Sequence, residues 1–215
     1  MKKISTIVTA LALIMAMTQC KKDESPVNFD TTNETVTILL KVDGDSGSKV
    51  IVNPALGTVN FEGGDKIYVG SGGKYVGVLT HDGNNHFVGN ITNPTEGQPL
   101  HFYFLGNVTP IETLGAGTTE TCSVIISDQT EHLPVISYAP SYESYSLSTY
   151  TYTAHLLNKC ALVKFNVTTP STTPIYITGM KNKVTIDFSQ NTVTPSIDGD
   201  GDIVLCAGNE ESFER

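Results

Sequence analysis

Residues 66–91 read KIYVGSGGKYVGVLTHDGNNHFVGNI, three short runs of β-branched and aromatic residues separated by turn residues. The runs occupy 66–69, 74–79 and 86–91. The Gly-rich and Asn-rich segments between them are typical of hairpin turns. This stretch therefore predicts consecutive antiparallel strands.

The same pattern continues on both sides of this stretch, and no long amphipathic helix is apparent. The run 100–105 (LHFYFL) is continuously apolar, which indicates a strand buried on both faces. Many short strands joined by Gly-, Asn- and Pro-rich turns predict an all-β protein, a sandwich of antiparallel sheets. The other expected strands are 35–42, 49–52, 58–61, 123–126, 135–138, 150–153, 161–167, 175–178, 184–188 and 203–205.

Length and composition exclude several classes of protein. The 215 residues suffice for one or two domains with an apolar core. Only 16% are charged and 39% are hydrophobic, which disfavours both a disordered chain and a coiled coil. The formal net charge is −9 and Arg215 is the single arginine, so we expect no nucleic-acid partner.

The first 19 residues have the form of a secretory signal peptide. Two lysines precede a short apolar stretch, which falls short of the roughly 20 residues that span a bilayer. Cys20 follows directly, and this placement resembles a bacterial lipoprotein signal in which the cysteine is acylated. The alternative is an ordinary secretory signal with an incidental cysteine. We expect a lipid anchor at Cys20 that holds the protein in the outer membrane.

Residues 20–34 are polar and aperiodic, so they predict a flexible tether. Its first charges resemble the signal that sends Bacteroidetes-type lipoproteins to the outer face of the cell; they are Lys21, Lys22, Asp23 and Glu24. The alternative is that these charges belong to a solvated spacer, which is compatible with their being an export signal. Asp30-Thr31-Thr32 resembles an O-glycosylation site of such exported proteins, with Thr31 as the acceptor.

The remaining chain divides at a Thr- and Pro-rich segment, residues 168–174. We expect a first β-sandwich domain over 35–169. Residues 170–215 would then hold a linker and the start of a second β domain, or the last strands of the first. About forty residues are too few for a complete domain, which favours a truncated one.

No catalytic or metal-binding constellation stands out. His81 and His86 flank a predicted turn, and their spacing is not one used for metals. The acidic segment 198–202 (DGDGD) lacks the later residues of an EF-hand loop and is interpreted as a turn. After Cys20 the cysteines are Cys122, Cys160 and Cys206, and we expect buried free thiols. The chain is therefore predicted to be non-enzymatic, without metal or cofactor.

A Ser/Thr-rich stretch carries five tyrosines that we single out as a candidate ligand or interface cluster: Tyr138, Tyr142, Tyr145, Tyr150 and Tyr152. Tyrosine rings stack on sugars and pack in protein interfaces. The alternative is that these tyrosines cover the core at strand edges.

Several of these segments together resemble fimbrillin-like surface lipoproteins. They are FEGGDKIYV (61–69), HFVGNI (86–91), LHFYF (100–104), AHLL (154–157) and ALVKF (161–165). The resemblance implies two Greek-key sandwiches of the transthyretin-like or immunoglobulin-like type, exported as a lipoprotein. It implies a stalk, tip or anchor subunit of a fimbria, or a related adhesin.

In that family, stalk subunits are matured by cleavage after an arginine near the first strand, which lets strands exchange between subunits. This chain has no arginine before Arg215, which favours an anchor, a tip subunit or an unpolymerised surface lipoprotein. The implied partners are other fimbrial subunits, through strand exchange, and a host receptor or glycan. The alternative is a surface glycan-binding lipoprotein of a polysaccharide-uptake system.

Overall fold

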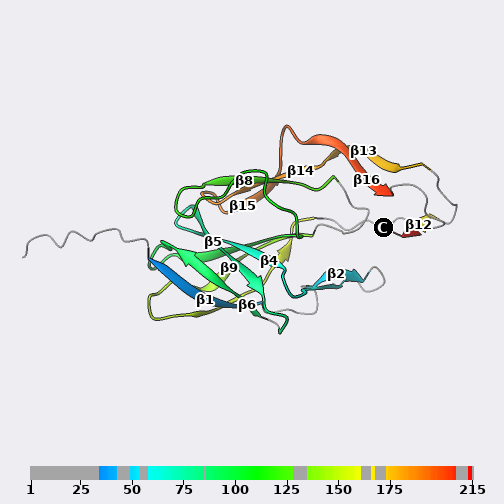
Figure 1. Ribbon diagram of the computed structural model, residues 1–215. Coiled ribbons are helices and arrows are strands. Elements are labelled where there is room, and N and C mark those ends of the chain that lie inside the picture. Colours follow the sequence, from blue (N-terminus) through cyan, green and yellow to red (C-terminus); the bar gives the residue numbers. More distant parts are fainter. Residues whose placement is uncertain are drawn as a thin grey trace, which may run out of the picture. The chain divides into compact units, whose positions relative to one another are not determined.

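The computed structural model describes residues 34–42, 49–53, 58–84, 86–127, 135–160, 166–167, 173–206 and 213–214 (Figure 1). The chain from Asn33 onward forms one compact unit. All regular structure in the described ranges is strand, and almost all strand pairs are antiparallel. The prediction of an all-β, mainly antiparallel protein is confirmed. Within these ranges no helix is long and apolar enough to cross a membrane.

The described ranges contain seventeen strands. They are β1 (Thr35–Val42), β2 (Lys49–Asn53), β3 (Thr58–Asn60), β4 (Lys66–Ser71), β5 (Lys74–His81), β6 (His86–Thr92), β7 (Pro99–Leu105), β8 (Thr121–Ile125), β9 (Ile136–Ser144), β10 (Thr151–Ala154), β11 (Leu157–Asn158), β12 (Asn166–Val167), β13 (Ile175–Lys181), β14 (Lys183–Asp187), β15 (Thr192–Pro195), β16 (Asp200–Cys206) and β17 (Phe213–Glu214).

The largest sheet closes on itself. Its order is β10-β1-β6-β5-β4-β7-β9-β11. A further pairing of Ala154 with Ser141 joins β10 to β9 and completes a ring of seven strands, to which β11 is attached through β9. β1 runs antiparallel to β6 and parallel to β10. We call this ring the closed sheet. It differs from the open-edged sheets of the predicted Greek-key sandwich, because pairing β1 with β10 covers two strand edges that would otherwise be exposed.

The closed sheet surrounds an apolar inner core. Strand alternation supplies it: in β1, Ile38 and Leu40 are buried while Leu39 between them is only half-buried. Gly77 and Gly89 allow β5 and β6 to approach, since a Cβ on either would lie within 2.5 Å of a carbonyl oxygen of the other strand.

A second, three-stranded sheet covers part of the outside of the closed sheet (Figure 1). This covering sheet has the order β15-β14-β8 and shares an outer core with β4, β5, β7 and β9. β7 lies between the two cores: Phe102 and Phe104 face the inner one, whereas Tyr103 and Leu105 face the outer one. The prediction of a strand buried on both faces at 100–105 is confirmed.

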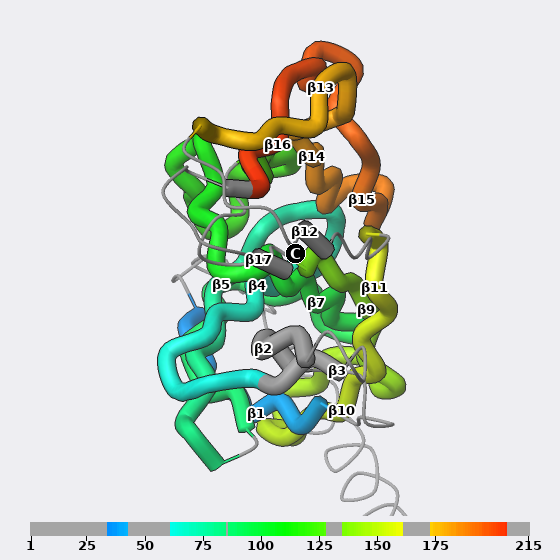
Figure 2. Tube along the Cα trace, turned by 90° about the vertical axis from the view of Figure 1, so that its right-hand side faces the viewer, coloured from blue at the N-terminus to red at the C-terminus, as the bar shows by residue number. Residues whose placement is uncertain are grey.

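Three two-stranded pairings complete the description: β2 with β3, β13 with β16 and β12 with β17. Figure 2 shows β14 and β15 next to each other, with β13 and β16 beyond them. β14 is hydrogen bonded to β8 through a register that pairs Ile186 with Cys122. Strands on both sides of residues 168–174 therefore share one sheet.

Candidate functional site

The predicted tyrosine cluster separates into buried and exposed members. Tyr145 and Tyr152 lie in the inner core with almost no exposed surface, so they cannot offer their rings to a ligand. Tyr142 and Tyr150 are 67% and 59% exposed. Alternation along β10 explains the burial of Tyr152, because Thr151 and Thr153 occupy its outward positions. The tyrosines available at the surface are thus fewer than the sequence predicted.

Tyr138 is half-buried and has polar neighbours. Its hydroxyl lies 2.8 Å from Nδ1 of His101, and the two rings are parallel. The Lys159 ammonium lies 5.4 Å from the centre of the Tyr138 ring, a cation–π contact. Burial lowers the pKa of His101 and raises that of Tyr138. His101 is thus a packed histidine whose neutral form is favoured.

The remaining predicted polar residues form turns. In the β5–β6 turn, Asp82 accepts backbone hydrogen bonds from Asn84 and His86. The hydrogen bond from Asn84 makes the largest contribution to lowering the pKa of Asp82. In the acidic segment, Asp198 and Asp200 pair with Lys183 and Lys181. No group of three metal-ligating side chains occurs among the described residues.

The two described cysteine side chains are free thiols. Cys122 is buried in the outer core, where burial, followed by the charge of Glu112, raises the pKa of its thiol to about 12. Burial also raises the pKa of Cys160. Neither is poised as a nucleophile, because the thiolate is the reactive form. The side chain of Cys206 lies outside the described residues.

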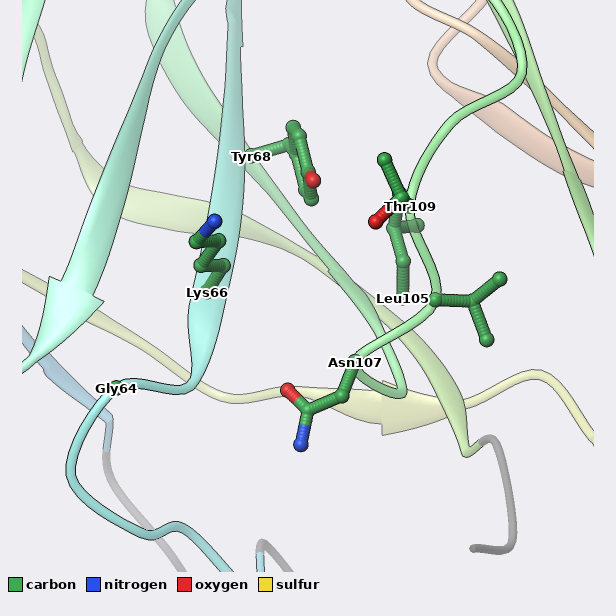
Figure 3. A pocket seen from close by; sticks show the side chains of 7 residues that line it. Gly64, Lys66, Tyr68, Leu105, Asn107 and Thr109 are labelled. Atoms are coloured by element: carbon green, nitrogen blue, oxygen red, sulfur yellow. The ribbon is translucent and has the colours of Figure 1, made fainter.

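A hollow of about 230 Å³ lies between the start of β4 and the turn after β7 (Figure 3). We call it the β4–β7 pocket. Lys66 and Tyr68 line one side of it, and Asn107 and Thr109 line the other. Leu105 adds an apolar contribution. No local sequence pattern indicates this pocket, because its two sides are separated by about forty residues of chain.

Strand register places the pocket at the end of the closed sheet where β1 finishes. β1 begins with Thr35 opposite Thr92 and approaches its end with Lys41 opposite His86. β4 begins at Lys66, which pairs with Thr80, close to the same β5–β6 turn. The pocket is therefore at the opposite end of the sheet from the point where the chain enters β1.

Asp65 connects the two turns that border the pocket. Its buried carboxylate accepts hydrogen bonds from the backbone N–H of Glu62 at 2.7 Å and from the side-chain amide of Asn107 at 2.8 Å. Asn107 has a left-handed backbone, with φ of 62°. Asp65 thus connects the turn before β4 to the turn after β7, which gives the Gly-Gly-Asp sequence at 63–65 a structural role.

Comparison with known proteins adds no relative. No protein-family model, curated protein or solved structure matches this chain. The predictions for Cys20, for the charges at 21–24 and for Thr31 lie outside the described residues.

Proposed function

We propose that this chain is a non-enzymatic lipoprotein of the outer membrane, anchored through Cys20 and facing the cell surface. It acts as a fimbrillin-like adhesion or structural subunit. The observation that carries the proposal is the N-terminal sequence, in which a signal-like segment, Cys20 and a charged tether follow one another. A folded part built of strands suits a protein exposed outside the cell. Among the described residues, no arrangement of catalytic groups argues for an enzyme instead.

We assign it to an anchor, a tip or an unpolymerised adhesin. β1 is paired on both sides, and its Ile38 and Leu40 are buried in the inner core. Removing this strand would uncover both side chains, each of which is worth about 1.5–3 kcal/mol when buried. Together with the absence of an arginine before Arg215, this favours a subunit that keeps its own first strand.

The finer fold assignment, a transthyretin-like or immunoglobulin-like sandwich, also belongs to this proposal. It is supported by the layering of the covering sheet on the closed sheet through the outer core.

Surface display of the full chain in its native cell tests the proposal. Intact cells are treated with an external protease and immunoblotted, with samples boiled and unboiled. We expect a single band that is lost on protease treatment. Replacing Lys21, Lys22, Asp23 and Glu24 by alanine should leave the band protected. Cys20→Ala should release the protein from the membrane, whereas Cys160→Ala should not. If the unmodified chain is protected from the external protease, the proposal is contradicted. If the unboiled sample shows a ladder that boiling removes, the unpolymerised form is contradicted.

A glycan-binding lipoprotein of a polysaccharide-uptake system is the second candidate. The exposed rings of Tyr142 and Tyr150 favour it, because exposed aromatic rings stack on sugars. Affinity electrophoresis in gels containing polysaccharide tests it. Retardation that is lost in Tyr142→Ala and Tyr150→Ala supports this function, and unchanged mobility of the parent chain opposes it.

A further inference from the structure

The β4–β7 pocket is bordered by the exposed side chains of Lys66, Asn107 and Thr109 and by the half-buried Tyr68, and these polar groups have few partners among the described residues. The ammonium of Lys66 and the hydroxyls of Tyr68 and Thr109 make no hydrogen bond or ion pair with the described residues. The amide nitrogen of Asn107 is bound to Asp65, which leaves its oxygen Oδ1 without a donor from that part of the chain. Groups of this kind, converging on one hollow, are typical of a binding site.

Their chemistry restricts the ligand. Lys66 offers a positive charge and three donors to an anion. The neighbouring Asp65 carboxylate is buried and already accepts two hydrogen bonds. In a chain of net charge −9, an unpaired lysine at a pocket therefore marks a place where a negative group is favoured.

An anion alone does not satisfy the pocket. The exposed Asn107 Oδ1 is an acceptor only, so a ligand that displaces water from it has to supply a donor in place of that water. The hydroxyls of Tyr68 and Thr109 can both donate and accept. Burial is the main factor that raises the pKa of Tyr68, followed by the neighbouring Tyr75 and Cys122, so its phenol keeps its proton at neutral pH. A ligand that carries both a negative charge and hydroxyl groups replaces the displaced water at all of these side chains.

The size of the hollow fixes the scale of the ligand. Its volume of about 230 Å³ is below the range of roughly 300–1,000 Å³ that holds drug-sized ligands. It therefore accepts one ring-sized group rather than an extended chain.

We propose that the β4–β7 pocket binds a single carboxylate-bearing sugar unit, such as a uronic acid, with its carboxylate on Lys66 and its hydroxyls on Tyr68, Asn107 and Thr109. This inference deepens the proposed adhesion function and rests on it for its biological setting. The pocket lies at the end of the closed sheet opposite the entry of the tether, which suits contact with a partner beyond the cell surface.

Titration of the purified full chain with D-glucuronate, followed by ligand-observed NMR or calorimetry, tests the inference. We expect glucuronate to bind and D-glucose to bind at least about tenfold more weakly, since hydrogen bonds to charged groups contribute that much or more. Lys66→Gln should weaken glucuronate binding about ten- to hundredfold, and Thr109→Val should weaken it to a smaller degree. Lys74→Gln is the matched control, because Lys74 lies at the other end of β4 and β5 and pairs with Glu120.

Four results overturn the inference: no binding of glucuronate at millimolar concentration, equal binding of glucose, equal binding of acetate, or unchanged binding in Lys66→Gln. Because binding is measured in solution, failure here leaves the proposed surface function standing. Conversely, loss of surface display leaves the sugar-acid site standing.

Discussion

The side-chain amide of Asn107 donates a 2.8 Å hydrogen bond to the buried carboxylate of Asp65. This contact joins the turn before β4 to the turn after β7. The same Asp65 carboxylate fixes the backbone of Glu62. One side chain thus determines both the entry into β4 and the shape of the pocket rim.

Asp65→Ala should lower the free energy of unfolding by about 1–3 kcal/mol, because the backbone N–H of Glu62 and the side-chain amide of Asn107 both lose a charged acceptor. Chemical denaturation measures this change. Glu62→Ala is the control, because Glu62 takes part only through its backbone. If Asp65→Ala and Glu62→Ala unfold at the same denaturant concentration, the Asp65 carboxylate does not stabilise the two turns that border the pocket.

Tyr145 and Tyr152 are both buried in the inner core, but their hydroxyl groups differ in hydrogen bonding. The Tyr152 hydroxyl donates to the carbonyl oxygen of Thr149 at 2.9 Å, whereas the buried Tyr145 hydroxyl has no hydrogen-bond partner among the described residues. Burial is the first cause that raises the pKa of Tyr145, to about 12. Tyr152→Phe should cost about 1 kcal/mol of stability, and Tyr145→Phe should be neutral or stabilising. Equal losses measured by thermal unfolding would contradict this assignment.

Gly89 should tolerate no larger side chain. A Cβ at this position would lie 2.4 Å from the carbonyl oxygen of Val78, so Gly89→Ala must separate β5 from β6. We expect a loss of more than about 2 kcal/mol, within the range found for overpacked cores. Gly63→Ala, where the nearest atom is 3.8 Å away, should be tolerated. Wild-type stability of Gly89→Ala, measured by denaturation, would count against the described pairing.

Stability should fall in mild acid because of His101. Burial lowers its pKa in the folded protein below the unfolded value of about 6.5. The unfolded chain then binds more protons between these two values, so stability is lost as pH falls through that window. His101→Gln should reduce the loss between pH 7.5 and pH 5, as measured by denaturation. An identical pH dependence in both proteins would exclude His101 as a cause.

Local pattern predicted individual strands well and their assembly poorly. The limits of β1 and the double burial of β7 follow from alternation and apolar continuity within a few residues. The parallel pairing of Leu39 with Thr151 joins strands more than a hundred residues apart, and no local signal encodes that register. The closed sheet was missed for this reason.

The candidate site shows the same limit. Tyr152 sits between two threonines in a short strand, and its burial agrees with the alternative interpretation, in which the tyrosines cover the core. Lys66 and Thr109 line one pocket because β4 pairs with β7 and because Asp65 accepts a hydrogen bond from Asn107 across the two adjoining turns. Sequence patterns therefore found aromatic residues by type but not the pocket that the fold assembles.

The mass of the mature protein, extracted from its native membranes and measured intact, tests the central claim most directly. The account predicts a chain that begins at Cys20, lacks residues 1–19 and carries added acyl chains at its N-terminus. A chain that retains residues 1–19, or one that begins near Cys20 without acyl groups, would contradict the lipid-anchored surface assignment.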